Sequence, residues 1–219
     1  MSADGRSRAF DINCTRCVRL SEFLEQVRNK HPAYHGRPVA PFGDPAARLL
    51  VVGLAPGMHG ANATGRPFTG DHAGILLYQT LHAFGFSSHA ESVSADDGLR
   101  LLDCRITNAV KCLPPANKPI AVEVRQCADY LAAELTQVPA GGVLVALGRI
   151  AHDAVLRCLG LKLGGYKFVH GTAHKLRDQN LTLIDSYHCS RYNTQTRRLT
   201  ESMFRDVFAQ ARSQLERRS

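Results

Sequence analysis

A long glycine-rich segment capable of chemistry follows an apolar run that ends at Val52. It reads Gly53-Leu-Ala-Pro-Gly-Met-His-Gly-Ala-Asn and continues to Thr-Gly-Arg-Pro-Phe-Thr-Gly-Asp71. Helical periodicity returns only after about 20 residues, and loops beyond roughly 12–15 residues are usually functional. Its five glycines let backbone N–H groups approach a ligand closely. The segment therefore predicts a binding loop, with Asp71 as its only carboxylate.

A phosphate loop is one chemistry that this segment could support. Gly60 and Gly65 have the required spacing, but Arg66 stands where a lysine is needed. Pro67 follows, and proline offers neither a hydroxyl for magnesium nor an N–H for phosphate. The sequence therefore excludes a P-loop nucleoside triphosphatase.

A second segment whose side chains could take part in chemistry begins at His188, just after another apolar run. A histidine there can donate a hydrogen bond to developing negative charge. The arginines that follow can hold phosphates, and Tyr192 can stack on a base or wedge into a duplex. Taken alone, His188 suits a hydrogen-bonded structural histidine. Together with the glycine-rich loop, it favours a functional site.

Four of the seven cysteines have a spacing that suits a metal. Cys14 and Cys17 form a CxxC pair, whose sulfurs can face one point across a short turn. Cys112 and Cys127 follow, with 14 residues between them. Zinc and an iron–sulfur cluster both accept four thiolates, and Cys127 also suits a helix's apolar stripe as a core thiol. The odd count and the lack of a signal peptide favour reduced thiols over a disulfide framework.

Alternating strands and helices are expected to position these residues. Buried strands are predicted at residues 48–53, 104–110, 143–148 and 181–185. Helices are predicted from a cap at Ser21 to before Pro32, at residues 75–84, 119–135 and 150–159, and at residues 200–215 with Thr200 as the cap. Apolar strands alternating with helices imply an α/β fold with a parallel sheet covered on both faces. Ligands bind beyond the carboxyl ends of such strands, where the glycine-rich loop and His188 both lie.

Length and charge bound the class of protein further. The 219 residues are 44% hydrophobic and 21% charged, which is typical of one globular domain. No apolar run approaches the roughly 18–20 residues of a membrane span, so no membrane partner is expected. Net charge is +8, with twelve basic against six acidic residues in 151–219. This excess suggests a polyanionic partner, although a solvated basic tail explains the charge equally well.

The motifs resemble those of the uracil-DNA glycosylase superfamily, in particular its family 5, the B-type enzymes with an iron–sulfur cluster. Residues 53–71 resemble the first motif. The second is matched by Ser186-Tyr-His-x-Ser-x-x-Asn-Thr-x-Thr-x-Arg-Leu-Thr200. Between them, Thr107-Asn108-Ala-Val-Lys-Cys112-x-Pro-Pro is also similar. The chain departs from the family at Cys189, where proline is usual, and at Arg197, where glycine is usual.

This resemblance implies a three-layer α/β/α fold with a short, mainly parallel four-stranded sheet, in a single glycosylase domain over residues 1–219. It implies a monofunctional DNA repair enzyme that flips uracil out of double-stranded DNA and hydrolyses its N-glycosidic bond, leaving an abasic site. Hypoxanthine and other altered bases are expected as further substrates. A monomer in the prokaryotic cytoplasm, associated with the nucleoid, is expected.

The resemblance also implies roles for particular residues. Asp71 would orient water or stabilise the cationic sugar, although it also suits a helix cap. His188 would bind the departing base, and Asn108 would recognise its Watson–Crick edge. The implied base-pocket residues are Gly53, Ala55, Gly57, His59, Asn62 and Phe68, with Phe68 stacking on the base. The implied DNA-binding residues are Arg191, Tyr192, Gln195, Arg197 and Arg198, with Tyr192 and Gln195 as candidate wedges.

The resemblance further implies that Cys14, Cys17, Cys112 and Cys127 hold a [4Fe–4S] cluster. The cluster would tie residues 1–20 to the body of the domain, leaving the other three cysteines surplus. Two alternatives remain. One is a non-enzymatic nucleic-acid-binding protein with a structural zinc or iron–sulfur site. The other is an electron carrier, which would more typically group its cysteines in one run and carry acidic charge.

Overall fold

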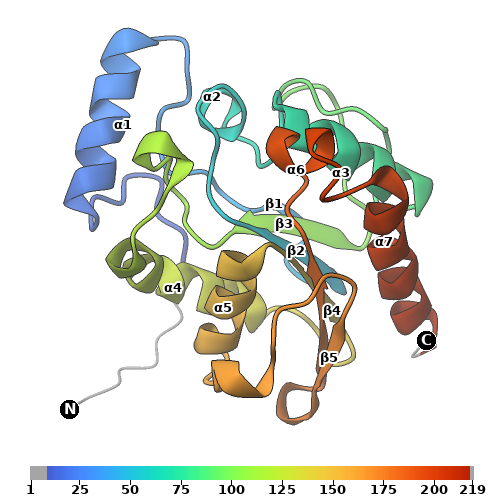
Figure 1. Ribbon diagram of the computed structural model, residues 1–219. Helices are drawn as coiled ribbons and strands as arrows, with labels where there is room; N and C mark the ends of the chain where they lie inside the picture. Colours follow the sequence, from blue (N-terminus) through green and yellow to red (C-terminus); the bar gives the residue numbers. More distant parts are fainter. Residues whose placement is uncertain (1–8, 218–219) are drawn as a thin grey trace, which may run out of the picture.

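The computed structural model describes residues 9–217, which build a six-stranded sheet between two layers of helices (Figure 1). The strands are β1 (Phe42–Gly43), β2 (Leu49–Gly53), β3 (Cys104–Asn108), β4 (Val143–Leu147), β5 (Ala173–Leu176) and β6 (Leu181–Ser186). Their spatial order is β1-β3-β2-β4-β6-β5. The predicted single domain and its tied N-terminal segment extend into residues 1–8 and 218–219, which lie outside the described residues.

The four predicted strands are confirmed, and β3, β2, β4 and β6 pair in parallel. The sheet is wider than the four strands predicted, because β1 and β5 pair antiparallel at its two edges. The register places Gly53 opposite Asn108 at the carboxyl ends of β2 and β3. The glycine-rich loop therefore starts beside the stretch that follows β3.

The helices are α1 (Val18–Lys30), α2 (Ala61–Thr64), α3 (His72–Ala83), α4 (Ala121–Leu135), α5 (Arg149–Cys158), α6 (Arg191–Gln195) and α7 (Glu201–Glu216). Short 3-10 turns occur at Pro115–Asn117, Leu163–Gly165 and Arg177–Gln179. None of the described helices is long and apolar enough to cross a membrane.

Alternate residues of each strand feed two separate cores. Leu49 and Val51 of β2 pack with α3 and α7, whereas Leu50 and Val52 pack with α4 and α5. This alternation follows from the pleat of a strand, whose successive side chains point to opposite faces. The predicted three-layer α/β/α arrangement is therefore confirmed (Figure 1). A third, smaller core joins α1 to α4.

Two helices begin earlier in the chain than predicted. Helix α1 begins at Val18, and the Ser21 hydroxyl donates to the Val18 carbonyl inside the helix instead of capping it. Helix α3 begins at His72, with Asp71 as its N-cap. The predicted cap of the last helix is confirmed, since Thr200 Oγ1 accepts from the Met203 N–H at 3.2 Å.

A buried cluster of one aspartate and two histidines holds the carboxyl end of β6, three residues before His188. Asp185 is fully buried and bonds His152 Nδ1 at 2.6 Å and His174 Nε2 at 2.9 Å. His152 Nε2 also faces the Tyr166 carbonyl at 2.9 Å. Burial lowers the pKa of His152, but the hydrogen bond and charge of Asp185 outweigh this and raise it. These ring nitrogens and carboxylate oxygens form one hydrogen-bonded cluster, which joins α5 and β5 to β6.

Candidate active site

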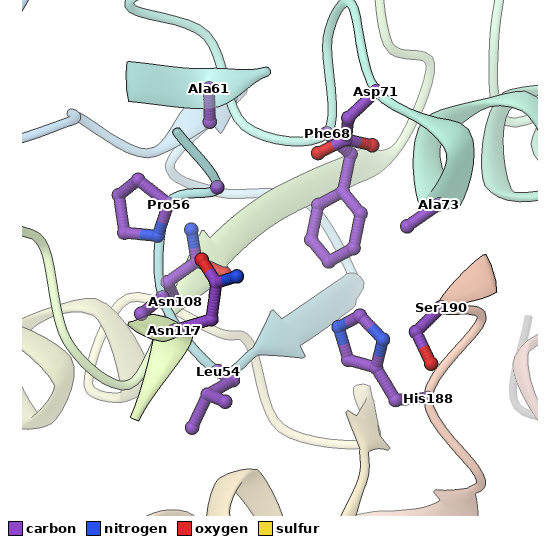
Figure 2. Close-up of a pocket in the computed structure, with 12 residues that line it drawn as sticks. Leu54, Pro56, Ala61, Phe68, Asp71, Ala73, Asn108, Asn117, His188 and Ser190 are labelled. Atoms are coloured by element: carbon purple, nitrogen blue, oxygen red, sulfur yellow. The ribbon is translucent and has the colours of Figure 1, made fainter. Parts of the chain in front are cut away.

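The main candidate site is a cavity of about 370 Å³ beyond the carboxyl ends of β2, β3 and β6 (Figure 2). This volume lies in the range of small-molecule sites. The cavity is lined by Leu54, Ala55, Pro56, Gly57, Ala61, Phe68, Asp71, Ala73, Asn108, Asn117, His188 and Ser190. Both sequence motifs and the stretch between them therefore contribute to one pocket.

Gly53 allows the Asn108 amide and the Phe68 ring to approach each other. A Cβ at Gly53 would overlap Asn108 Oδ1 and would lie 2.7 Å from Phe68 Cζ. Asn108 Oδ1 is buried and has no hydrogen-bond partner among the described residues. An unpaired buried polar atom is costly unless a ligand satisfies it. The geometry therefore suits a planar ligand with hydrogen-bonding edges.

The Phe68 ring lies on the opposite side of the cavity from Asn108 and Asn117, next to His188 (Figure 2). The Phe68 and His188 rings are stacked, with centroids 5.8 Å apart and 29° between their planes. Phe68 adopts a left-handed backbone with φ of 55°, which is unusual for a non-glycine residue. The Tyr78 hydroxyl donates to the neighbouring Pro67 carbonyl at 2.9 Å and helps to hold this turn.

Arg66 also anchors the turn from within the protein. Its guanidinium bonds Asp97 at 2.5 Å and Thr69 Oγ1 at 2.9 Å, and Arg66 is only 4% exposed. The hydrogen bond from the Arg66 guanidinium holds the pKa of Asp97 far below its ordinary value. Arg66, which stands where a phosphate loop would have lysine, therefore has a structural role in holding this turn.

Neutral imidazole is the expected form of His188. Burial lowers the pKa of His188 to about 4, and no described residue hydrogen-bonds its ring nitrogens. Its backbone carbonyl accepts from Asn193 Nδ2 at 2.8 Å, which fixes the main chain at this position. A neutral imidazole carries one N–H, so the ring can donate one hydrogen bond into the pocket.

Asp71 acts as a helix cap and also lines the cavity. Its Oδ1 accepts from the Gly74 N–H at 2.8 Å at the start of α3. Its Oδ2 turns toward Gly60, where an added Cβ would lie 2.5 Å away. Burial raises the pKa of Asp71, although hydrogen bonds from Gly74 and Ala73 favour the ionised form. Both roles considered from the sequence are thus compatible in geometry.

The structure brings together most, but not all, of the expected pocket residues. Ala55, Gly57, Phe68, Asp71, Asn108 and His188 line the cavity, and Gly53 lies beneath it. The cavity lining does not include two of the expected residues, His59 and Asn62. His59 is exposed and bonds the Tyr34 hydroxyl at 2.9 Å. Asn62 is fully buried in α2, with neither amide atom bonded to a described residue.

Asn117 and Ser190 line the cavity but were not anticipated from the sequence. Asn117 lies in the 3-10 turn after Pro114, where Ala116 and Asn117 both have positive φ angles of 52° and 55°. Two successive left-handed residues present the Asn117 amide at the pocket (Figure 2). Ser190 caps α6 by accepting from the Asn193 N–H. For Asn117, the only signal in the sequence was its place shortly after the pair Pro114-Pro115.

The expected DNA-binding loop contains the short helix α6, which lies beside the pocket. Tyr192 is 70% exposed on this helix, as a wedge residue should be. Arg197 is also exposed and has a left-handed backbone with φ of 57°, the conformation in which the family's glycine is favoured. Arg198 lies over the Tyr187 ring at 4.8 Å. Arg191 and Gln195 line two further grooves next to His72 of α3.

Four cysteines line a separate small cavity between α1, α4 and the stretch after β3. These are Cys14, Cys17, Cys112 and Cys127, and none of them forms a disulfide. Burial raises the pKa values of Cys112 and Cys127, so a cation would be needed to keep their thiolates there. Four thiolates around one small cavity suit either tetrahedral zinc or an iron–sulfur cluster.

The remaining described cysteines lie outside that cavity. Cys104 and Cys189 are buried in the core beneath α3 and α7. Cys158 is half-buried at the end of α5. Cys189 thus occupies a packed position next to His188, which is compatible with the proline usual there.

Comparisons with known proteins agree with this geometry. A family model described as "Uracil DNA glycosylase superfamily" matches residues 40–212. A type-5 uracil-DNA glycosylase of Thermus thermophilus is 48% identical, over 91% of this chain and 92% of its own. One of Pyrobaculum aerophilum is 43% identical, over 91% and 88%. A type-4 uracil-DNA glycosylase of Archaeoglobus fulgidus is 32% identical, over 75% and 77%.

The family match covers the sheet, the pocket and the loop after β6, and the type-5 relatives match nearly the whole chain. The motif resemblance noted in the sequence is thereby confirmed. The chain belongs to the uracil-DNA glycosylase superfamily, within its type-5 branch.

Proposed function

We propose that this protein is a monofunctional DNA repair glycosylase that removes uracil from double-stranded DNA by hydrolysing its N-glycosidic bond. The observation that carries the proposal is the pocket in which an unpartnered Asn108 amide, the Phe68 ring and a neutral His188 face one cavity. Relatives named type-5 uracil-DNA glycosylase are 41–48% identical to this chain. Hypoxanthine and other deaminated bases are proposed as further substrates.

Binding begins with extrusion of the base, because its reacting atoms are out of reach inside the duplex. We assign the strand contacts to Arg191, Arg197 and Arg198. The exposed Tyr192 ring, with Gln195 on the same short helix, would fill the gap left in the stack. The groove lined by Arg191 has a volume of about 530 Å³ and shares Asp71 with the base pocket, so it offers a path for the strand.

The flipped base would lie between the Phe68 ring and the amide edge of Asn108. An amide offers one acceptor and two donors, which match the alternating edge of uracil. Asn117 lies on the same side and would close the pocket over the base. Ala55 and Gly57 supply backbone on which the base can rest. His59 and Asn62 would shape the loop behind this surface.

Bond cleavage makes the sugar cationic and the departing base anionic. The electron pair of the C1′–N bond moves to the base, whose oxygen takes a hydrogen bond from the neutral His188 N–H. The proton stays on His188, because the imidazole is neutral and its N–H is too weak an acid to protonate the departing base anion. A donor of this kind typically contributes roughly 3–4 kcal/mol to lowering the barrier.

Asp71 would complete hydrolysis from the sugar side. Its pocket-facing oxygen can stabilise the cationic sugar, orient the water whose oxygen bonds to C1′, and accept the proton that this water loses. Burial raises the pKa of Asp71, which makes the carboxylate a stronger base than an exposed one. The same residue keeps its hydrogen bond to Gly74 and thus its orientation.

The four-cysteine cavity is proposed to hold a [4Fe–4S] cluster of structural role. The four free thiols fit such a group, because all four line one small cavity and a cluster of this kind is held by four cysteine thiolates. The Lys111 N–H donates to Cys127 Sγ at 3.3 Å, a contact that also stabilises a cluster sulfur. When bound, the cluster would cross-link α1, α4 and the stretch after β3.

We further propose that the enzyme acts as a monomer in the prokaryotic cytoplasm, in association with the nucleoid. Its substrate is DNA, and the relatives named above come from prokaryotes.

The direct test is incubation of the purified protein with a uracil-containing duplex, followed by alkaline cleavage of abasic sites. We expect free uracil and a cleavable site at the uracil position, and an intact strand before alkali. Binding of the duplex without release of uracil would instead favour a non-enzymatic DNA-binding protein.

A further inference from the structure

We propose that the buried ion pair of Lys111 and Glu134 is a positioning pair that holds the Asn108 amide in the base pocket. Lys111 follows β3 by three residues, and its side chain is 1% exposed. Its ammonium bonds Glu134 Oε2 at 2.8 Å, and Glu134 is itself buried on α4. The inference rests on the proposed role of Asn108 in binding the base.

The ammonium turns back onto the end of its own strand. Lys111 Nζ donates to Thr107 Oγ1 at 2.5 Å and to the Asn108 backbone carbonyl at 2.8 Å. With the bond to Glu134, all three donors of the ammonium are used. The last two residues of β3 are therefore fixed to one point of charge, and that point is fixed to α4.

The Asn108 side chain depends on this support. Its Oδ1 has no partner among the described residues, and Gly53 opposite has no side chain that could hold it. The direction of the amide is thus set by the backbone of Asn108, which Lys111 bonds. A misplacement of about 1 Å at such a group can cost roughly 100-fold in rate.

Stability alone does not account for the pair. A buried ion pair is often no more stabilising than apolar residues of similar volume. Here Glu134 Oε1 is also buried without a partner among the described residues, which adds a cost. A pair that is costly to bury but ties the last two residues of β3 to α4 suits positioning better than stabilisation.

The helix that carries Glu134 also carries Cys127, whose sulfur accepts from the Lys111 backbone N–H. Lys111 is therefore joined to α4 through both its main chain and its side chain. Lys111 lines the four-cysteine cavity and also bonds the backbone of Asn108, which lines the base pocket.

The test is a double variant, Lys111→Met with Glu134→Leu, which removes both charges and leaves neither unpaired. We expect it to fold with a melting temperature near that of the wild type and to retain its affinity for the duplex. Its single-turnover excision rate on a uracil duplex should fall at least about ten-fold, since the Asn108 amide loses its support. Lys111→Met alone should be far less stable, because Glu134 is then a buried charge without a partner.

A matched control removes an ion pair at the opposite end of the same strands. Arg48 and Asp103 bond at 2.6 Å just before β2 and β3. Arg48→Met with Asp103→Asn should leave the excision rate unchanged. A comparable loss of rate in this control would overturn the inference, because it would show a general response of the sheet.

A double-mutant cycle separates positioning from a merely structural role. In an Asn108→Ala background, the Lys111→Met and Glu134→Leu changes should lower the rate less than about two-fold, since their effect acts through Asn108. If the fold-losses of Asn108→Ala and of the Lys111/Glu134 double change simply multiply, the two act independently and the inference is overturned. If the double variant does not fold, Lys111→Arg is measured in the wild-type protein and in Asn108→Ala. A planar guanidinium keeps the charge but cannot donate three hydrogen bonds from a single nitrogen, as the ammonium does.

The outcomes also separate this inference from the proposed function. Full activity of Asn108→Ala would overturn the role of Asn108 and with it the inference. A slow Asn108→Ala beside a fully active, folded double variant would overturn the inference alone.

Discussion

Burial shifts the pKa values of the two titratable pocket residues, His188 and Asp71, in opposite directions. In both cases it disfavours the charged form. For His188 the result is a neutral donor at physiological pH. For Asp71 it is a carboxylate that takes up a proton at higher pH than an exposed aspartate. The acid side of the rate profile should therefore belong to Asp71.

The first prediction concerns the pH dependence of the single-turnover excision rate. The rate should fall as the pH falls through the pKa of Asp71, which lies above its ordinary value of 3.8. His188 should contribute no inflection near 6.5, the ordinary histidine value, because burial lowers its pKa to about 4. Rates measured between pH 4.5 and 8.5 check this, and an inflection near 6.5 that disappears in His188→Ala would contradict it.

The second prediction concerns Arg197, which has a left-handed backbone. Arg197→Gly should raise the free energy of unfolding by about 1 kcal/mol, because glycine adopts this conformation without strain. The same change should weaken DNA binding, since it removes a positive charge from the loop. Chemical denaturation and binding titrations measure the two effects. Arg197→Ala is the matched control, which should lose the affinity without the gain in stability.

Single residues were predictable where a motif carried them. Phe68, Asp71, Asn108 and His188 were identified by position in the motifs, and all four line the pocket. Asn117 was missed, because its place depends on two left-handed residues in a stretch without periodicity. The ion pair of Lys111 was also invisible, since a lone lysine after a strand is usually exposed.

At the scale of elements, the sequence predicted what is apolar and regular. The four central strands are continuous apolar runs, and all were found. The edge strands β1 and β5 were missed, since β1 has two residues and β5 is only partly buried. Helix α6 was expected as a loop, because five polar residues carry no apolar face. It exists through its Ser190 cap and its bond from Asn193 to the His188 carbonyl.

The third prediction concerns the four-cysteine cavity, which joins α1 to α4. Cys112→Ser should lower the iron content, the visible absorption and the melting temperature together. It should also expose the chain around α1 to proteases, because the small core there rests on few other contacts. Metal analysis, optical spectroscopy and limited proteolysis check this. Cys158→Ser, at a half-buried thiol outside the cavity, should behave like the wild type.

At the scale of the whole molecule, the charge is distributed unevenly. The excess of basic residues lies in the last third of the chain, and the loop after His188 holds three arginines without a carboxylate. This loop lies beside the pocket, whereas the β5–β6 turn at Arg177 is at the other end of β6. The net charge therefore suggested a polyanionic partner, and the fold puts the acid-free loop beside the pocket, where we propose that it contacts DNA.

The fourth prediction concerns salt. Arg191→Ala should reduce the slope of log affinity against log salt by about 1, because one phosphate contact releases about one counterion. Arg177→Ala removes an equal charge at the far end of the sheet and should leave the slope unchanged. Duplex binding measured across a range of salt concentrations distinguishes them. Equal slopes for both variants would mean that the basic excess acts only as a diffuse charge.

The most direct measurement of the central claim compares wild type and Asp71→Asn in single-turnover excision of uracil from a duplex, with duplex affinity measured in parallel. Asparagine retains a cap for α3 but loses the negative charge that faces the sugar. We predict a loss of roughly 100-fold or more in the excision rate, with little change in affinity. Excision at the wild-type rate by folded Asp71→Asn would contradict the claim that glycosidic bond cleavage takes place in this pocket.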